Sequence, residues 1–521
     1  MRKDKIRVAI AQINPTVGDI SGNADKIIRF VRQAEKARAD IVCFPELALC
    51  GYPPEDLLLK PWFIRSNLRA IKAIARCIKD IVAVVGFVDR VGSASHKAGD
   101  VLRRGKRPAA QGSNTGLYNS AAIISSGRIC SVYHKVFLPN YGVFDEKRYF
   151  SGGGDYPVFR IGNIIFGVNI CEDIWGLPGP LDYQVRKGAR LIINISASPF
   201  YMSRGKARER FLGRQAKRSG AFVVYNNLVG GQDELVFDGN SMVIDNKGKV
   251  LGRCVSFGED LGLWDLDVLP CGKKNAALFL RDVGGERPAL ALRKIKASEG
   301  EAEVYAALVL GLRDYLRKNR FGKVVIGLSG GIDSSLVAVI AVDALGADNV
   351  IGVFMPSRYT SGISRQDAFK LAKNLGIEIK EIPIGGIFRA YLSQLAREFR
   401  RRRKDIAEEN LQARIRGNIL MALSNKFGYL VLATGNKSEV SCGYCTVYGD
   451  MAGGFSLIKD VPKTLVYRLA EFRNGCGQGA VIPPRILSRP PTAELRPGQK
   501  DSDSLPDYSI LDAILKRYIE E

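Results

Sequence analysis

Histidine is scarce in this sequence of 521 residues, which contains only two, His96 and His134. Catalytic or metal sites that need several imidazoles are therefore almost excluded. General acids, bases and nucleophiles must come instead from cysteine, lysine and carboxylate side chains, or from bound ions.

Long hydrophobic runs are also missing. No apolar stretch reaches the roughly 20 residues that a membrane-spanning helix needs, and even the run after Ser335 is interrupted by Asp343. The N-terminal residues MRKDKIRVAIAQINP pass directly into strand-like alternation, without the apolar core of a signal peptide. We therefore expect a cytoplasmic protein that does not bind a membrane.

The ten cysteines do not suggest a disulfide framework, because they are scattered through a long chain and several lie in apolar, strand-like contexts. We expect most of them to be reduced core residues. Cys442 and Cys445 form a single C-x-x-C pair without a second pair, so we expect no zinc site there and interpret the spacing as incidental.

Positive charge is in excess, with a formal net charge of +24. Such a balance suits an anionic partner, which could be a nucleic acid, a nucleotide or a membrane surface. Part of the charge lies in REFRRRRKD, residues 397–405. This run could contact phosphates, but we interpret it as a solvated loop, the more common situation.

The chain is long enough to favour two domains. In residues 1–270, short apolar strands and longer charged helical segments indicate a layered α/β domain. In residues 301–521, helices and strands alternate, which is typical of a doubly wound parallel sheet. Residues 271–300 are mixed in composition and punctuated by Gly and Pro, and we interpret them as a linker.

The stretch IGLSGGIDSSLVAV, residues 326–339, reads as a buried strand that turns tightly into a helix. Glycine amides at a helix N-terminus form a site for an anion. The turn lacks the Walker A pattern and resembles the SGGxDS loop of the ATP pyrophosphatase (PP-loop) family. That resemblance implies ATP binding, with Asp333 on magnesium, although Asp333 could instead cap the helix. The residues expected to bind ATP here are Ser329, Gly330, Gly331, Asp333, Ser334 and Ser335.

Two longer strings, DIAEENLQARIRGNILMALSNK (405–426) and ATGNKSEVSCGYCTVYGDMAGGFSLIKDVPKT (433–464), resemble the glutamine-dependent NAD synthetase family. The resemblance implies that Glu439 joins Asp333 on magnesium and also lies at the deamido-NAD site. Alternatively, Glu439 could be an ordinary helix partner and Arg414 a surface charge. The remaining assignments that the resemblance implies are Thr434 and Lys463 for ATP, and Asn410 and Arg414 for deamido-NAD.

Three side chains at or just beyond expected strand ends carry the chemistry of the first half: Glu46, Lys135 and Cys171. A thiol is a useful nucleophile as the thiolate, which an ammonium group stabilises, and a carboxylate can move the proton. Taken singly, a cysteine at a strand end is most often inert core, and a lone Glu or Lys is most often surface.

With their flanking sequences, these three residues resemble the Glu-Lys-Cys triad of the nitrilase and amidase superfamily, in its glutaminase branch. The resemblance implies an α-β-β-α sandwich in which Cys171 attacks glutamine, Glu46 is the general base and Lys135 helps to stabilise the oxyanion. It also implies that glutamine's backbone groups are held by Tyr118, Ser198 and Arg204, with Arg204 opposite the carboxylate.

Together the two halves imply an amidotransferase that uses glutamine, ATP and deamido-NAD, binds no nucleic acid, assembles as a homo-oligomer and shelters ammonia between its sites. Family chains usually continue with a basic tail beyond the position of Glu521, and residues 92–116 look like a basic loop extension. Two alternatives remain open: a tRNA-modifying PP-loop enzyme, and a stand-alone amidase whose second half senses nucleotide.

Overall fold

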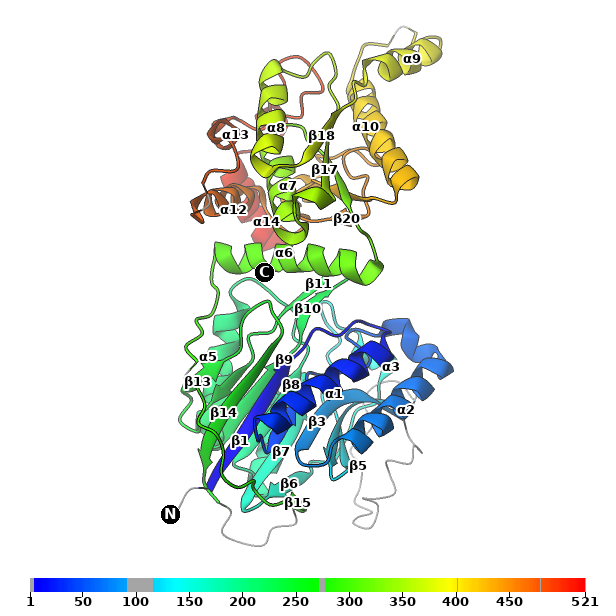
Figure 1. Cartoon of the computed structure of the whole chain (residues 1–521). Helices are drawn as coiled ribbons and strands as arrows, with labels where there is room; N and C mark the ends of the chain where they lie inside the picture. The colour runs from blue at the N-terminus through cyan, green and yellow to red at the C-terminus, as the bar shows by residue number, and fades with distance from the viewer. Residues whose placement is uncertain are drawn as a thin grey trace. The chain divides into compact units, whose positions relative to one another are not determined.

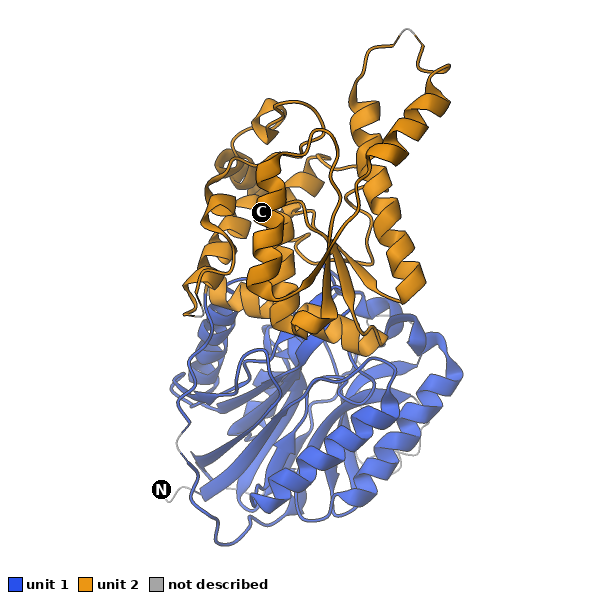
Figure 2. Cartoon of the chain, turned by 45° about the horizontal axis from the view of Figure 1, so that its top comes forward, with its two compact units in different colours: residues 1–299 blue, residues 300–521 orange. Residues whose placement is uncertain are grey.

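The computed structural model describes residues 4–90, 116–270, 277–291, 293–400, 402–477 and 479–520. The chain divides into two compact units, residues 1–299 and residues 300–521 (Figure 2). His96 and nearly all of the expected loop extension, residues 92–115, lie outside the described residues.

Unit 1 contains two large sheets. The six-stranded sheet has the order β14 (Asp260–Val268), β1 (Asp4–Gln12), β2 (Ile41–Cys43), β3 (Val82–Arg90), β4 (Leu117–Ser125) and β5 (Arg128–His134). The seven-stranded sheet has the order β13 (Val250–Arg253), β12 (Met242–Ile244), β9 (Phe222–Asn227), β8 (Leu191–Ser196), β7 (Ile164–Ile170), β6 (Val158–Ile161) and β15 (Leu278–Arg281). A separate hairpin is formed by β10 (Val229–Gln232) and β11 (Leu235–Asp238).

Alternation along the central strands gives each sheet two apolar faces. In β1, Ile6, Val8 and Ile10 face the second sheet in one core, whereas Ala9 and Ala11 belong to a core on the opposite face. Helices α1 (Ile20–Lys36) and α2 (Pro61–Cys77) cover the first sheet (Figure 1). Helices α4 (Pro180–Arg186) and α5 (Arg204–Ser219) pack on the second. The predicted α-β-β-α sandwich is therefore confirmed.

Part of the segment predicted as a linker belongs to unit 1. Strand β15 pairs in parallel with β6 at the edge of the seven-stranded sheet. Beyond it, Arg287 pairs with buried Asp40, and Arg293 pairs with Asp260. Residues 278–291 and Arg293 are thus fixed to the sandwich by a strand and by ion pairs.

Unit 2 is built on one five-stranded parallel sheet. Its order is β18 (Glu378–Glu381), β17 (Val350–Phe354), β16 (Val324–Gly327), β19 (Leu430–Ala433) and β20 (Phe455–Ser456). Every neighbouring pair is parallel, and the chain moves outward from β16 first to one edge and then to the other. This order is that of a doubly wound sheet, which confirms the prediction.

Helices cover both faces of this sheet. One face packs against α9 (Gly385–Leu395) and α10 (Ile406–Phe427) through a buried cluster that includes Phe388 and Ile415. The other face packs against α7 (Ile332–Leu345), which is flanked by α6 (Glu301–Asn319) and α12 (Lys463–Gly475) (Figure 1). Among the described residues, no helix is long and apolar enough to cross a bilayer.

Candidate active sites

The predicted triad of unit 1 comes together in the interior of the sandwich. The Lys135 ammonium donates hydrogen bonds to Glu46 Oε1 at 2.7 Å and to Glu146 Oε1 at 2.8 Å. The second oxygen of Glu46 accepts from the backbone N–H of Ala197 at 2.9 Å, and Asn119 donates to Oε1 at 2.7 Å. Glu46 is thus held in one orientation by three different segments.

Cys171 occupies a strained turn at the end of β7. Its φ angle of 45° lies in the left-handed region, and a short 3-10 helix, Cys171–Ile174, begins there. A non-glycine residue persists in this region only where the surrounding structure enforces it, which is common for nucleophiles presented on a tight turn. The turn is enforced in part by buried Asp173, whose carboxylate accepts from the N–H groups of Ile170, Val136 and Phe137.

Burial and neighbouring charges together set the protonation of the triad. Burial and the negative charge of Glu46 raise the pKa of the Cys171 thiol well above its usual value, although Lys135 acts in the opposite direction. Burial would lower the pKa of Lys135, but Glu146, Glu46 and Cys171 outweigh it and raise that pKa well above its usual value. The resting site therefore holds a thiol beside a charged ammonium, and attack by sulfur requires a base.

Glu146 is a fourth residue of this site that sequence reasoning missed. It is 4% exposed, and it bonds both Lys135 and the hydroxyl of Tyr52. Burial, reinforced by Glu46 and opposed by Lys135, raises the pKa of Glu146 to about 7. The sequence feature that could have identified Glu146 is its position 11 residues after Lys135, in the same segment.

This pKa predicts a pH-dependent stability difference for Glu146→Gln. The folded state binds the proton of Glu146 more tightly than the unfolded chain does. The unfolding free energy of the wild type therefore falls as pH rises from about 4.5 to about 7. The variant has no carboxyl group at this position and does not show this decrease. The difference in unfolding free energy, variant minus wild type, should therefore increase by ~2–3 kcal/mol between pH 5 and pH 7.5.

Denaturant unfolding followed by tryptophan fluorescence measures this difference in unit 1 alone, because all three tryptophans (Trp62, Trp175 and Trp264) lie there. The variant Asp145→Asn is the control, because it removes a neighbouring carboxylate that is exposed and not buried. A constant offset of Glu146→Gln from wild type would mean that Glu146 titrates normally.

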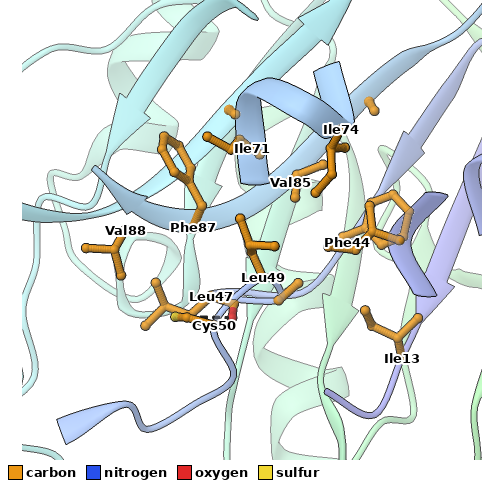
Figure 3. Close-up of a cluster of buried hydrophobic side chains, with 14 of the residues drawn as sticks. Ile13, Phe44, Leu47, Leu49, Cys50, Ile71, Ile74, Val85, Phe87 and Val88 are labelled. Atoms are coloured by element: carbon orange, nitrogen blue, oxygen red, sulfur yellow. Dashed lines mark hydrogen bonds between the residues drawn. The ribbon is translucent and has the colours of Figure 1, made fainter. Parts of the chain in front are cut away.

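The loop that carries Glu46 lies directly on strand β3. Leu47 and Leu49 pack in a buried cluster with Val85 and Phe87 (Figure 3). The N–H of Leu49 donates to the Gly86 carbonyl at 3.1 Å. A Cβ at Gly86 would lie 2.3 Å from the Pro45 carbonyl oxygen and 2.5 Å from the Leu47 nitrogen. Only glycine lets the loop approach this closely.

We therefore expect Gly86→Ala to displace the Glu46 backbone. Overpacking of this kind should cost ~1–3 kcal/mol of stability. Hydrolysis of glutamine should fall by about 100-fold, since a small misplacement of a catalytic group has effects of that size. Steady-state glutaminase assays and unfolding curves test this, with Gly285→Ala as control because a Cβ there meets nothing within 4 Å. Normal glutaminase activity in Gly86→Ala would contradict the expectation.

The three residues predicted to hold glutamine are placed differently from one another. Ser198 is buried and its backbone is bonded on both sides by Asn227. Arg204 begins α5 and acts electrostatically on Tyr141, as Cys171 does. Tyr118 instead stacks on His134, with ring centroids 4.2 Å apart.

A tyrosine that the sequence did not single out contacts the residue that follows the nucleophile. The hydroxyl of Tyr141 donates to Glu172, the residue after Cys171, at 3.0 Å. Burial and the charge of Glu172 raise the pKa of Tyr141 to about 12. Tyr141 thus lies within electrostatic range of Glu172, Cys171 and Arg204, and this group offers donors and acceptors that could hold a polar substrate.

In unit 2, the glycine turn follows β16 as expected. Gly330 has a φ of 79°, and a Cβ there would lie 2.3 Å from the Ser364 carbonyl oxygen, so the turn requires glycine. The Ser329 hydroxyl accepts from the N–H of Gly331 and contacts the Ser334 hydroxyl at 3.1 Å. The Ser335 hydroxyl is buried and donates to the Gly331 carbonyl at 2.7 Å, so it stabilises the turn itself.

Asp333 does not cap helix α7, which has Gly331 as its N-cap. Its carboxylate instead accepts from Lys463 at 2.6 Å and from Asn436 at 2.9 Å. Lys463 also donates to Glu439 at 3.1 Å. Two carboxylates and one ammonium group therefore lie close together beside the glycine turn, although Asp333 and Lys463 are 130 residues apart in the sequence.

The charges of this group influence one another strongly. Burial and repulsion from Asp333 raise the pKa of Glu439 to about 7, although Lys463 opposes this. Burial would lower the pKa of Lys463, but the two carboxylates outweigh it and raise that pKa well above its usual value. No group of three or more His, Cys, Asp or Glu side chains within the described ranges is placed to hold a metal. A cation here would need further oxygen ligands, as Mg²⁺ commonly obtains from substrate phosphates.

Two of the three residues predicted to bind the dinucleotide, Asn410 and Arg414, lie on α10, whereas Glu439 lies on α11 (Lys437–Ser441). Asn410 Oδ1 accepts from the Thr446 hydroxyl at 2.8 Å, and the exposed Arg414 donates to the Val447 carbonyl at 3.3 Å. Thr434 directly follows β19 at the carboxyl edge of the sheet. Arg416, which was not predicted, donates to the Met355 carbonyl, and burial lowers its pKa to about 10. A half-buried guanidinium near this edge is suited to an anionic ligand.

Comparison with known proteins accounts for both units. The family model described as carbon-nitrogen hydrolase matches residues 7–272, and the one described as NAD synthase matches residues 304–521. A glutamine-dependent NAD(+) synthetase from Thermotoga maritima is 47% identical over 540 residues, covering 99% of this chain and 89% of the relative. The chain belongs to the glutamine-dependent NAD(+) synthetase family. The resemblance predicted from the sequence is thus confirmed.

Other members of the glutamine-dependent NAD(+) synthetase family agree in sequence and fold. The Synechocystis sp. enzyme is 45% identical over 528 residues, covering 99% of this chain and 88% of the relative. The solved structure of the Acinetobacter baumannii enzyme, a complex with ADP, is 41% identical with a TM-score of 0.81, covering 99% of this chain and 88% of that one. The Cytophaga hutchinsonii structure shares the fold at 24% identity, with a TM-score of 0.78 and coverage of 99% and 86%.

Proposed function

We propose that the protein is a glutamine-hydrolysing NAD(+) synthetase, a carbon-nitrogen ligase that converts deamido-NAD, ATP and glutamine into NAD, AMP, diphosphate and glutamate. The observation that carries the proposal is that one chain of this family contains both a Glu46-Lys135-Cys171 constellation and a glycine turn beside Asp333, Glu439 and Lys463. A tRNA-modifying enzyme would leave the first of these two sites without a purpose, and a nucleotide-sensing amidase would bind ATP without forming AMP.

In the glutaminase half, Glu46 takes the thiol proton as Cys171 Sγ attacks the side-chain amide carbon of glutamine. Lys135 donates toward the oxyanion that forms, while Glu146 keeps the ammonium charged and oriented. The C–N bond breaks, the proton passes to the leaving nitrogen and ammonia departs. Water then cleaves the glutamyl thioester to release glutamate.

In the synthetase half, glycine amides at the start of α7 hold the diphosphate portion of ATP, and Lys463 adds a positive charge beside it. The nicotinate carboxylate of deamido-NAD attacks the α-phosphorus, and diphosphate leaves. Ammonia then displaces AMP from the adenylated carboxyl group, which yields the amide of NAD.

Magnesium is the cofactor that suits Asp333 and Glu439, because Mg²⁺ is usually bound by one or two carboxylates together with phosphates. Bound there, it would neutralise the charge on the departing diphosphate. Phosphate-rich substrates also explain part of the excess of positive charge. The homo-oligomeric state, the cytoplasmic location and the sheltered path for ammonia stay predictions.

Product analysis of the purified full-length protein tests the proposal. Given ATP, Mg²⁺ and deamido-NAD, it should form NAD and AMP in equal amounts with either glutamine or ammonium, and glutamate only with glutamine. Adding EDTA should stop the formation of NAD and AMP but not the release of glutamate. Excess Mg²⁺ should restore the formation of NAD and AMP. Glutamate without NAD from either nitrogen source would refute the synthetase assignment.

A further inference from the structure

A buried ion pair joins α5 to β11 in unit 1. Arg208, on α5, donates to both carboxylate oxygens of Asp238, at the end of β11, at 3.1 to 3.2 Å. Arg208 is 1% exposed and Asp238 is 4% exposed. The guanidinium also lies over the ring of Tyr225, with its carbon 5.4 Å from the ring centroid.

Stability alone does not account for this pair. Removing two charges from water costs several kcal/mol per ion, and apolar residues of similar volume are often as stable or more stable in such positions. The main effect of the pair is therefore on the position of the residues around it and not on the free energy of unfolding.

Asp238 is connected to Ser198 through one side chain. Asn227 Nδ2 donates to Asp238 Oδ1 at 3.1 Å and to the Ser198 carbonyl at 3.2 Å. Asn227 Oδ1 accepts from the Ser198 N–H at 2.9 Å. Both backbone polar groups of Ser198 are thus held by an amide that is itself oriented by Asp238.

Arg208 is connected to Arg204 through the helix. The two residues are four apart on α5, so their side chains lie on the same face one turn apart. The thiolate form of Cys171 raises the pKa of Arg208, so the pair lies within electrostatic range of the nucleophile. One ion pair therefore fixes the segments that carry both Ser198 and Arg204.

We propose that the Arg208–Asp238 pair positions Ser198 and Arg204 as a subsite for the α-carboxylate of glutamine, so that its loss weakens recognition of that group without impairing the sulfur chemistry at Cys171. The inference rests on the proposed glutaminase function. Both residues are positioning residues, since neither is argued to touch the substrate.

The test compares two alkylating agents and the kinetics of glutamine hydrolysis in the full-length protein. The glutamine analogue 6-diazo-5-oxo-L-norleucine carries the α-carboxylate, whereas iodoacetamide does not. In Asp238→Asn and in the milder Arg208→Lys, the glutamine KM should rise about 10- to 100-fold with kcat little changed. Alkylation of Cys171 by the analogue, followed by mass spectrometry of its peptide, should slow by a similar factor, and alkylation by iodoacetamide should not change.

Two controls separate positioning from simple destabilisation. Arg218→Met removes a more exposed ion pair, with Asp182, from the same helix and should leave both alkylation rates unchanged. The double variant Arg208→Met with Asp238→Leu restores apolar packing without the charges and should keep the raised KM. A normal KM in this double variant, or equal loss of both alkylation reactions in Arg208→Lys, would overturn the proposal. A wild type that releases no glutamate would instead refute the glutaminase function itself.

Discussion

Replacing Cys171 by alanine should abolish NAD formation from glutamine and leave NAD formation from ammonium unchanged. The loss should be on the order of 10⁴-fold or more, since no other group can form the thioester. Ammonium-dependent synthesis should persist because Asp333, Glu439 and Lys463 all belong to unit 2, whereas Cys171 belongs to unit 1. The measurement is NAD formed with each nitrogen source at saturating ATP and deamido-NAD.

A matched control for this variant is Cys43→Ala. Cys43 is also a fully buried thiol of the sandwich, and burial raises its pKa to about 12. It should retain glutamine-dependent synthesis. Glutamine-dependent NAD formation that survives in Cys171→Ala would refute the nucleophile assignment.

Replacing Asp333 by asparagine should have the complementary effect. NAD formation from both glutamine and ammonium should fall by roughly 10³-fold, because one of the two carboxylates beside the glycine turn loses its charge while the side-chain shape is kept. Release of glutamate from glutamine should continue, since the triad in unit 1 is untouched. Separate assays of NAD and glutamate on the same sample measure both.

Asp348→Asn serves as the control, because Asp348 is exposed and lies just beyond the end of α7. It should keep both activities. If Asp333→Asn instead lost glutamate release and retained NAD synthesis from ammonium, the roles assigned to the two units would be reversed.

The sequence was sufficient to predict the supporting fold of both sites. The strand and helix around the glycine turn carry local signals. The structure places β16 at Val324–Gly327 and α7 at Ile332–Leu345, in agreement with the strand, turn and helix expected across residues 326–339. The spacing of hydrophobic residues and the positions of glycine turns are local features of the sequence. They can therefore be recognised without knowledge of the tertiary structure.

Features that depend on distant partners were not predictable in this way. Glu146 is a site residue because Lys135 and Tyr52 surround it in the folded chain. The convergence of Lys463 on Asp333 joins positions 130 residues apart. The contact of Tyr141 with Glu172 was also missed, because it joins two segments that lie 31 residues apart in the sequence.

Strand β15 has a practical consequence for dissecting the chain. A fragment that stops at residue 270, where composition first changes, would delete β15 and leave β6 as an unprotected edge strand. Unpaired amides and carbonyls along such an edge invite intermolecular pairing and aggregation. A fragment extended through Glu299 keeps β15 and the Arg287 and Arg293 ion pairs. An isolated glutaminase that precipitated would therefore indicate where the chain was cut rather than that unit 1 cannot fold alone.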